Sequence, residues 1–176
     1  MLESIITSKT RINLLLKFFL NSKTKSYLRS LEFEFGESSN SVRVELNRLE
    51  KAGLLISAIE RNKKMFFANT THPLYCDINN IIKKYIGIDL IISQIFEKIP
   101  NLREAYLTGD FASGKNSNVI DFLLAGNNMN EQQINEIVTV AEPLLPRKFR
   151  YSIIKSNQHE YFETNNNSFI IWQSKN

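Results

Sequence analysis

Two amides and a guanidinium group recur at helical spacing in the first half of this 176-residue chain. Asn40, Arg43 and Asn47 are separated by three and then four residues, so on a helix they share one face. Asparagine and arginine side chains can each make two hydrogen bonds, to the edges of adenine and guanine respectively, in the major groove of duplex DNA. These three residues, with Ser39 just before them, are therefore candidates for reading a base sequence.

A second group of side chains carries positive charge. Arg61, Lys63 and Lys64 fall between two short apolar runs, and Lys25 lies further upstream. Cationic side chains of this kind bind phosphate oxygens, which orients a protein on DNA without reading its sequence. We expect all four to contact phosphates.

The helix that would carry the first group is predicted by its apolar residues. Val42, Leu46 and Leu49 recur at helical spacing and form one stripe that can face a core. Ser38 or Ser39 can cap the start of this helix by accepting a hydrogen bond from a free amide of the first turn. The polar residues then lie on the side opposite the stripe, open to a partner.

A β-hairpin is predicted directly after this helix. Gly53 is suited to the left-handed conformation that ends a helix. Residues 54–59 and 65–68 are short apolar runs joined by residues 60–64, which contain Asn62 and the cations. The hairpin tip is therefore expected to carry the phosphate-binding groups.

Two further helices are predicted upstream. Ser8 can cap a strongly apolar helix over residues 8–20, and a second helix is expected over 25–35 with Gly36 as its stop. The glycine-bearing turn at 36–39 then leads into the polar helix. Two helices joined by such a turn, with the second presented outward, form a helix-turn-helix.

Each polar residue alone has a simpler interpretation, since such residues usually form the solvated face of a helix. The combination of capped helix, glycine stop and cationic hairpin favours DNA binding over that interpretation. The charge distribution points the same way. Residues 1–99 carry a balance of +5 and residues 100–176 a balance of −1, so the positive charge lies in the half that holds the helix-turn-helix pattern.

The bulk composition excludes several classes of protein. The apolar fraction of 43% can fill one core or two small ones. Apolar runs are too short to span a bilayer, and the opening residues lack a secretory signal, so we expect a cytoplasmic protein without membrane contact. One cysteine and two histidines exclude an intrachain disulfide and make a zinc cluster implausible.

Four stretches of the first half stand out as motifs. They are Ser-Lys-Thr-Arg-Ile at 8–12, Phe-Gly-Glu-Ser at 35–38, Ser-Val-Arg-Val-Glu-Leu-Asn-Arg-Leu-Glu-Lys-Ala-Gly-Leu-Leu at 41–55, and Asn-Thr-Thr-His-Pro-Leu at 69–74. Together they resemble the ArsR-type winged helix-turn-helix regulators of prokaryotes, most closely the subgroup joined to a nucleotidyltransferase-like domain. The resemblance covers residues 1–86 and implies binding to double-stranded DNA.

The second half looks like the opening of a minimal nucleotidyltransferase domain. A predicted strand at 105–107 meets a glycine turn, and a second strand follows at 120–125. The family pattern is Gly-Ser after the first strand and Asp-x-Asp on the second. The resemblance implies that the glycine turn cradles nucleotide phosphates. The aspartates, with a third acid on a later strand, hold two metal ions.

Several positions depart from that pattern. Gly109 matches the glycine and Asp121 the second aspartate, but Asp110 stands where the serine should be and Val119 replaces the first aspartate. The later strand, 148–154, offers no carboxylate. Two divalent ions need several oxygen ligands, and a negative charge at Asp110 repels phosphates.

We therefore expect a vestigial motif, comprising Gly109, Asp110 and Asp121, with no catalytic residues, no metal site and no cofactor. The alternative is that Asp110 and Asp121 together bind one metal ion.

The predicted fold class is α+β, with two domains. A winged helix-turn-helix domain takes residues 1–87, and a small α/β nucleotidyltransferase-like domain takes residues 88–176, with a connecting helix at 89–99. The helices over 74–86 and 89–99 are candidates for a dimer interface or for the joint between the domains. The remaining predicted elements are a helix over 130–145 and strands over 148–154 and 168–172.

The leading hypothesis is a homodimeric, sequence-specific transcription regulator whose C-terminal domain is catalytically inactive and is either a nucleotide sensor or a scaffold. The alternative is an active nucleotidyltransferase that uses the winged helix to dock on a substrate or partner. A third interpretation makes the winged helix a protein–protein module, which predicts no salt-dependent affinity for DNA.

Overall fold

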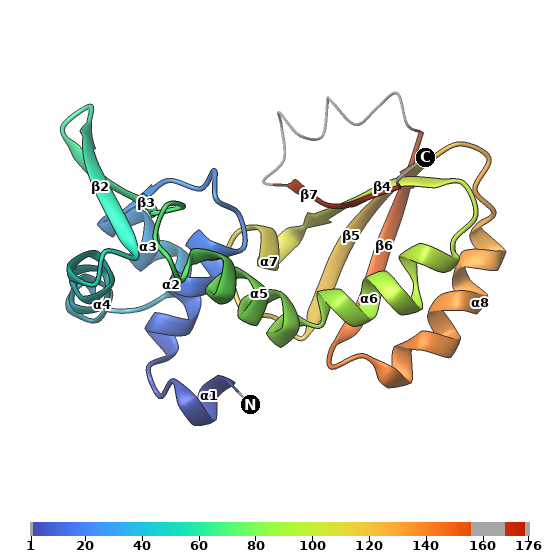
Figure 1. Cartoon of the computed structure of the whole chain (residues 1–176), viewed down its shortest axis with the longest axis horizontal. Coiled ribbons are helices and arrows are strands. Elements are labelled where there is room, and N and C mark those ends of the chain that lie inside the picture. Colours follow the sequence, from blue (N-terminus) through green and yellow to red (C-terminus); the bar gives the residue numbers. More distant parts are fainter. Residues whose placement is uncertain (1, 156–167, 175–176) are drawn as a thin grey trace. The chain divides into compact units, whose positions relative to one another are not determined.

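The computed structural model describes residues 2–155 and 168–174, which fall into two compact units. Unit 1 contains the described residues up to Tyr85 together with Gly114–Asn116, and unit 2 contains the other described residues from Ile86 onward. Each unit has its own sheet and its own buried side chains. The described chain is thus a mixed α and β protein, and Figure 1 labels most of its helices and strands.

Unit 1 combines helices with a small antiparallel sheet (Figure 1). Its helices are α1 (Leu2–Ile5), α2 (Lys9–Phe19), α3 (Leu28–Phe35), α4 (Ser39–Lys51) and α5 (Tyr75–Ile86), of which only the last residue of α5 belongs to unit 2. Its strands are β1 (Ser26–Tyr27), β2 (Leu55–Glu60) and β3 (Lys63–Ala68), in the order β1-β3-β2. The sheet is therefore a hairpin of β2 and β3 extended by one short strand.

Helix α2 forms the centre of unit 1. As predicted, Ser8 caps it, accepting a hydrogen bond from the Arg11 amide at 3.2 Å. The apolar residues at helical spacing on α2 are buried, namely Ile12, Leu15, Leu16 and Phe19, and so are Leu14 and Phe18 on its other sides. Because α2 packs against both α4 and β3, some of its polar side chains, such as Asn13 and Lys17, are buried as well.

Helix α3 begins later than the sequence predicts. The prediction of a helix from residue 25 is wrong, because Ser26 and Tyr27 pair with β3 as a short strand and the helix starts at Leu28. Pairing with a strand that lies far along the chain overrides the local helical pattern. The predicted stop is confirmed, since Gly36 adopts φ +62° and its amide donates to the Glu32 carbonyl at 2.9 Å.

The hairpin is tighter than predicted. Gly53, with φ +73°, ends the turn after α4, and β2 then runs to Glu60. The connection is a two-residue turn of Arg61 and Asn62, both with positive φ, as tight hairpins require. The predicted connection over residues 60–64 is therefore too long, because Glu60 belongs to β2 and both Lys63 and Lys64 belong to β3.

Unit 2 is a four-stranded sheet with helices (Figure 1). Its elements are α6 (Ile88–Gln94), η1 (Phe96–Lys98), β4 (Leu102–Thr108), α7 (Gly109–Ala112), β5 (Val119–Gly126), α8 (Glu131–Ala141), η2 (Glu142–Leu144), β6 (Lys148–Ile154) and β7 (Phe169–Gln173). The strand order is β6-β5-β4-β7, with β5 and β6 parallel and the other neighbours antiparallel. The connection between the two parallel strands contains α8, as parallel pairing requires a crossover.

An aromatic cluster forms part of the core of unit 2. The ring of Phe96, in η1, lies 5.1 Å from that of Phe122 and 6.2 Å from that of Phe149, measured between centroids. The ring of Trp172 on β7 lies 5.9 Å from the same phenylalanine. The Phe96 side chain is only 1% exposed, and its three ring contacts join η1 to strands β5, β6 and β7.

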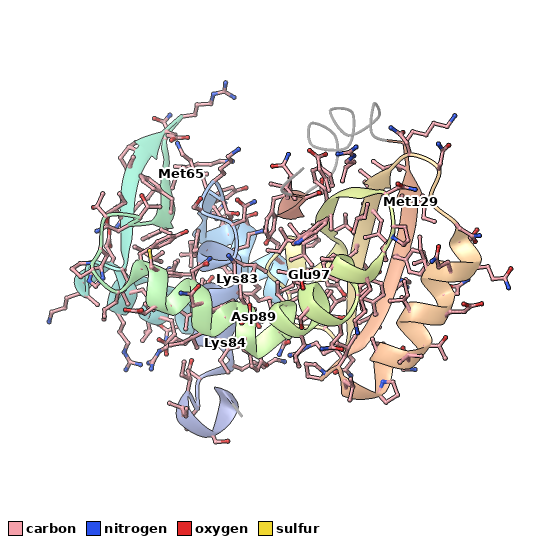
Figure 2. The ribbon with its side chains drawn as sticks, turned by 45° about the vertical axis from the view of Figure 1, so that its right-hand side comes forward. Met65, Lys83, Lys84, Asp89, Glu97 and Met129 are labelled. Atoms are coloured by element: carbon pink, nitrogen blue, oxygen red, sulfur yellow. The ribbon has the colours of Figure 1, made fainter. Side chains whose placement is uncertain are left out.

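The predicted connecting helix over 89–99 is interrupted. Ile95 has φ −120° and ψ −67°, so α6 ends and a 3-10 turn follows. Asp89 and Glu97 are exposed in this region (Figure 2), and so is the apolar side chain of Leu90, at 43%. Ile91 and Ile95 are buried within their own unit, which removes the most apolar side of this segment from the predicted dimer interface.

None of the helices within residues 2–155 and 168–174 is long and apolar enough to cross a membrane. The longest, α4, has 13 residues, whereas a span needs roughly 20.

Candidate nucleic-acid interface

The outer face of α4 is exposed along its length. Val42 and Leu46 are buried against the rest of unit 1, as the apolar stripe predicts. Asn40, Arg43 and Asn47 are all exposed. The structure therefore leaves the three candidate base-reading side chains open to solvent.

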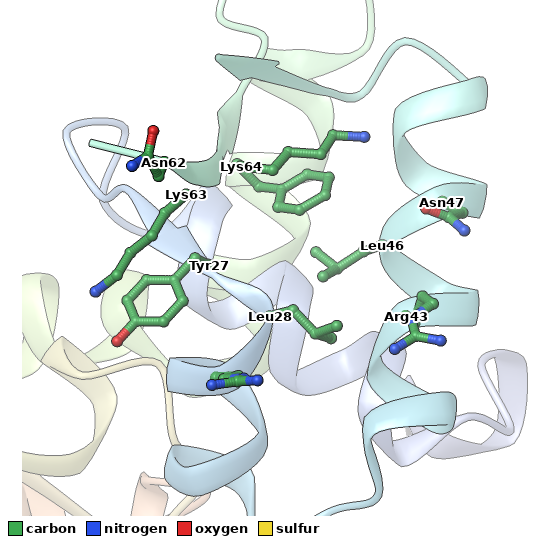
Figure 3. Close-up of a pocket in the computed structure, with 10 residues that line it drawn as sticks. Tyr27, Leu28, Arg43, Leu46, Asn47, Asn62, Lys63 and Lys64 are labelled. Atoms are coloured by element: carbon green, nitrogen blue, oxygen red, sulfur yellow. The ribbon is translucent and has the colours of Figure 1, made fainter. Parts of the chain in front are cut away.

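An open groove of about 560 Å³ lies between α4 and the β2–β3 hairpin (Figure 3). We call it the α4–hairpin groove, and it is lined by Tyr27, Leu28, Arg29, Arg43, Leu46, Asn47, Asn62, Lys63, Lys64 and Phe66. Leu46 and Phe66 are buried, whereas Arg43, Asn47 and Lys63 are exposed, so apolar groups form the floor and polar groups the rim. Asn40 is exposed but does not line the groove.

Two candidate phosphate-binding residues of the hairpin are well exposed. The Lys63 ammonium group lies 4.1 Å from the centroid of the Tyr27 ring, which holds the cation at the groove rim (Figure 3). Arg61 occupies the turn itself with φ +47°. Within the described part of the chain, neither Arg61 nor Arg43 forms an ion pair, so both guanidinium groups can bind an external anion.

The other two candidate cations already have carboxylate partners. Lys64 Nζ lies 2.7 Å from Glu50 Oε2, and Lys25 Nζ lies 2.6 Å from Glu60 Oε1. Hydrogen bonds from Lys64 and from Ser57 lower the pKa of the Glu50 carboxyl below its ordinary value. These lysines are thus less available for phosphate than their exposure suggests.

Ser39 is also engaged within the protein. Its hydroxyl donates to the carboxylate of Glu32 on α3, and it is the preceding Ser38 that caps α4, accepting from the Ser41 amide at 3.3 Å. The sequence left the cap open between the two serines. A hydroxyl that already bonds a carboxylate is a weaker candidate for contacting DNA.

Sequence reasoning did not select Arg29 or Tyr27, both of which line the groove. Arg29 is exposed in the first turn of α3 and forms no ion pair with the residues that the structure describes. The sequence signal that could have identified Arg29 is its positive charge in the first turn of α3, the helix that precedes α4. Tyr27 carried no such signal, because its place in strand β1 depends on pairing with β3.

A buried charge cluster anchors α4 from behind. Glu45 is buried, and its Oε2 accepts a hydrogen bond from Arg11 Nε of α2 at 2.8 Å. Arg48 Nη1 lies 3.2 Å from Glu45 Oε1. Burial raises the pKa of Glu45, but hydrogen bonds from Arg11 and Ser8 and the charges of Arg11 and Arg48 outweigh burial, so the pKa is lowered overall.

Replacing Arg11 with alanine is expected to lower the free energy of unfolding by about 1–2 kcal/mol at neutral pH, because buried Glu45 would keep only the solvent-exposed Arg48 as a charged partner. Since the folded-state pKa of Glu45 lies below its ordinary value of 4.5, the stabilisation is present above pH 4.5 and is lost as the pH falls through the folded-state pKa. Urea unfolding across this pH range measures it. A difference between wild type and Arg11→Ala that stays constant into the acid range would contradict this assignment.

The candidate motif of unit 2, predicted at Gly109, Asp110 and Asp121, includes one ion pair. Gly109 follows β4 with φ +65°, and a Cβ there would lie 2.5 Å from Asp121 Oδ2, so only glycine fits. Asp121 on β5 forms an ion pair with Arg150, its direct neighbour on β6. The hydrogen bond from Arg150 to Asp121, followed by the charges of Asp121 and Asp110, raises the pKa of the arginine.

Arg150 is a further residue that sequence reasoning did not select. Alternation along β6 places it on one face of the sheet with Tyr151 on the other, but only the β5–β6 register puts it beside Asp121. Within residues 2–155 and 168–174 no group of three or more histidine, cysteine or acidic side chains is arranged to hold a metal ion.

Comparisons with known proteins add little to this geometry. No protein-family model matches the chain, and no curated protein matches it. A crystal structure of a protein from Sulfolobus solfataricus, provisionally named a nucleotidyltransferase, is similar to part of it. That likeness has 18% sequence identity and a TM-score of 0.39, and covers 54% of this chain and 87% of the other. A likeness of this strength does not assign a function.

Proposed function

We propose that unit 1 is a winged helix-turn-helix module that binds duplex DNA, and that the chain is a sequence-specific transcription regulator. One observation carries the proposal: Arg43 and Asn47 of α4 and Lys63 of the hairpin line the same open groove. Base-reading groups on a helix and cations on the adjoining wing are what a helix seated in the major groove requires.

The exposed side chains divide into two roles. Asn40, Arg43 and Asn47 read base edges, because their amide and guanidinium groups can make paired hydrogen bonds to purines. Arg61 and Lys63 bind phosphates, because they lie on the hairpin, away from the helix that enters the groove.

Four other residues differ in how available their side chains are for contact with DNA. Arg29 is added as a phosphate contact, since it lines the groove and is exposed. Lys25 and Lys64 contribute less, because Glu60 and Glu50 neutralise much of their charge in the unbound protein. Ser39 contributes only if its hydroxyl leaves Glu32.

Selection of bound sequences from a random duplex pool tests the proposal. A regulator enriches a defined sequence, and its affinity falls steeply as salt is added because bound cations displace counterions from the phosphates. Recovery of no sequence, together with the absence of salt-dependent binding, would instead favour a protein–protein module.

Lys63→Ala is expected to weaken binding to the selected and to random duplexes by the same factor. Phosphate contacts carry no sequence information, and the loss of one reduces the slope of log affinity against log salt by about 1. Fluorescence anisotropy over a salt series measures both effects. A loss confined to the selected sequence would place Lys63 at a base edge instead.

We also propose that the chain forms a homodimer. Leu74, Ile78 and Ile81 share one side of α5 and its entry, and Leu74 and Ile81 are 53% and 50% exposed. Association would cover this stripe, and a two-fold dimer would present two α4 helices to a pseudo-palindromic site. Sedimentation equilibrium tests the dimer, and the mass of a single chain at micromolar concentration would contradict it.

The final part of the proposal is that unit 2 is a nucleotidyltransferase-like module without catalytic activity. It is supported by the ion pair between Asp121 and Arg150, which satisfies that carboxylate with a fixed cation. Asp110, which is exposed, is then the only carboxylate of the motif without an ion-pair partner among the described residues. One carboxylate supplies too few oxygen ligands for two divalent ions.

Incubation of the full chain with labelled nucleoside triphosphates and magnesium is expected to give no transfer above the level without protein. Asp121→Ala is the matched variant, since it removes the one aspartate that matches the motif. Turnover in the wild type that disappears in Asp121→Ala would establish the alternative, an active nucleotidyltransferase.

A further inference from the structure

The α4–hairpin groove has an apolar floor that base reading and phosphate binding leave unused. Leu28, Leu46 and Phe66 line it, and Leu46 and Phe66 are buried beneath the rim. Its volume of about 560 Å³ is typical of sites that hold a small organic molecule. Figure 3 shows Leu28 and Leu46 lying between the hairpin and Arg43.

The rim of this groove carries an excess of positive charge. Arg29, Arg43 and Lys63 line it, and no described carboxylate forms an ion pair with any of the three. The remaining cation, Lys64, is paired with Glu50. A ligand that complements both the floor and the rim has an apolar body and a negative charge.

We propose that the α4–hairpin groove binds a small aromatic anion, a ring system bearing a carboxylate or sulfonate. The ring packs on Leu28 and against Tyr27, above the buried Leu46 and Phe66, and the anionic group bonds to Arg43 and Arg29. Aromatic rings suit this groove because Tyr27, which is half-buried, lines it beside the leucine side chains. Binding of the anion does not depend on the proposed function.

The same placement makes the anion a competitor of DNA, and this part rests on the proposed function. Arg43 and Asn47 cannot bond a purine edge while a ligand occupies the space in front of them. For mutually exclusive binding, an anion at ten times its own Kd raises the apparent Kd for DNA about elevenfold. The groove would therefore serve as an effector site on the DNA-binding face itself.

The binding step is tested with anilinonaphthalene sulfonate, whose fluorescence rises in apolar surroundings, titrated into the folded full chain. We expect saturation at one site and a Kd about tenfold weaker for Arg43→Ala, which loses one charged hydrogen bond. Lys84→Ala removes the same charge from α5, outside the groove, and is the matched control (Figure 2). Uncharged phenylnaphthylamine should bind at least about tenfold more weakly than the sulfonate.

The outcomes separate the two proposals. Equal affinity of wild type, Arg43→Ala and Lys84→Ala for the sulfonate, or equal affinity for the sulfonate and the uncharged amine, would overturn the anion site. DNA binding that the sulfonate leaves unchanged at saturation would overturn competition. Sulfonate binding that depends on Arg43, in a chain with no affinity for DNA, would support the anion site while removing the proposed function.

Discussion

Arg43→Ala is expected to weaken binding to the selected duplex by about 1–3 kcal/mol, roughly five- to 150-fold in Kd, while affinity for random duplex changes little. Arg43 is exposed on α4, lines the α4–hairpin groove and forms no ion pair with a described residue. Its removal therefore costs the folded protein almost nothing, and the loss falls on contacts with base edges. Relaxed preference at one or two positions of the site is the expected signature.

Repeating the selection with Arg43→Ala, followed by anisotropy on selected and random duplexes, measures this effect. Lys84→Ala is the control for the loss of one positive charge, and Lys63→Ala shows what the loss of a phosphate contact looks like. If Arg43→Ala weakened every duplex by the same factor, the division between base-reading and phosphate-binding residues would be wrong.

Phe96→Ala is expected to lower the free energy of unfolding of unit 2 by about 3–5 kcal/mol. The ring is 1% exposed and contacts Phe122, Phe149 and Trp172, so its removal leaves a cavity at the point where η1 meets three strands. The surrounding rings are held by separate strands and can collapse only partly into that space.

Trp172 is the only tryptophan of the chain and contacts the Phe96 ring, so its fluorescence reports unfolding of this core directly. Val140→Ala, on the exposed side of α8, is the control and should change stability by less than about 0.5 kcal/mol. A similarly small effect of Phe96→Ala would show that the aromatic cluster does not hold unit 2 together.

The sequence determined most of the local structure around the candidate interface. Caps, glycine stops and apolar spacing act over a few residues, and for that reason Ser8, Gly36 and Gly53 lie where the pattern predicts. The burial of Val42, Leu46 and Leu49 follows from the same periodicity, and it leaves the opposite face of α4 exposed.

Tertiary structure alone decided which charged groups remain open to a partner. Lys64 pairs with Glu50 because the hairpin folds back on α4, and Arg150 pairs with Asp121 because β6 lies in register beside β5. Strand β1 replaced the start of a predicted helix for the same reason. These partners lie far apart along the chain, so periodicity, which reports only on neighbours within a turn or a strand, carries no information about them.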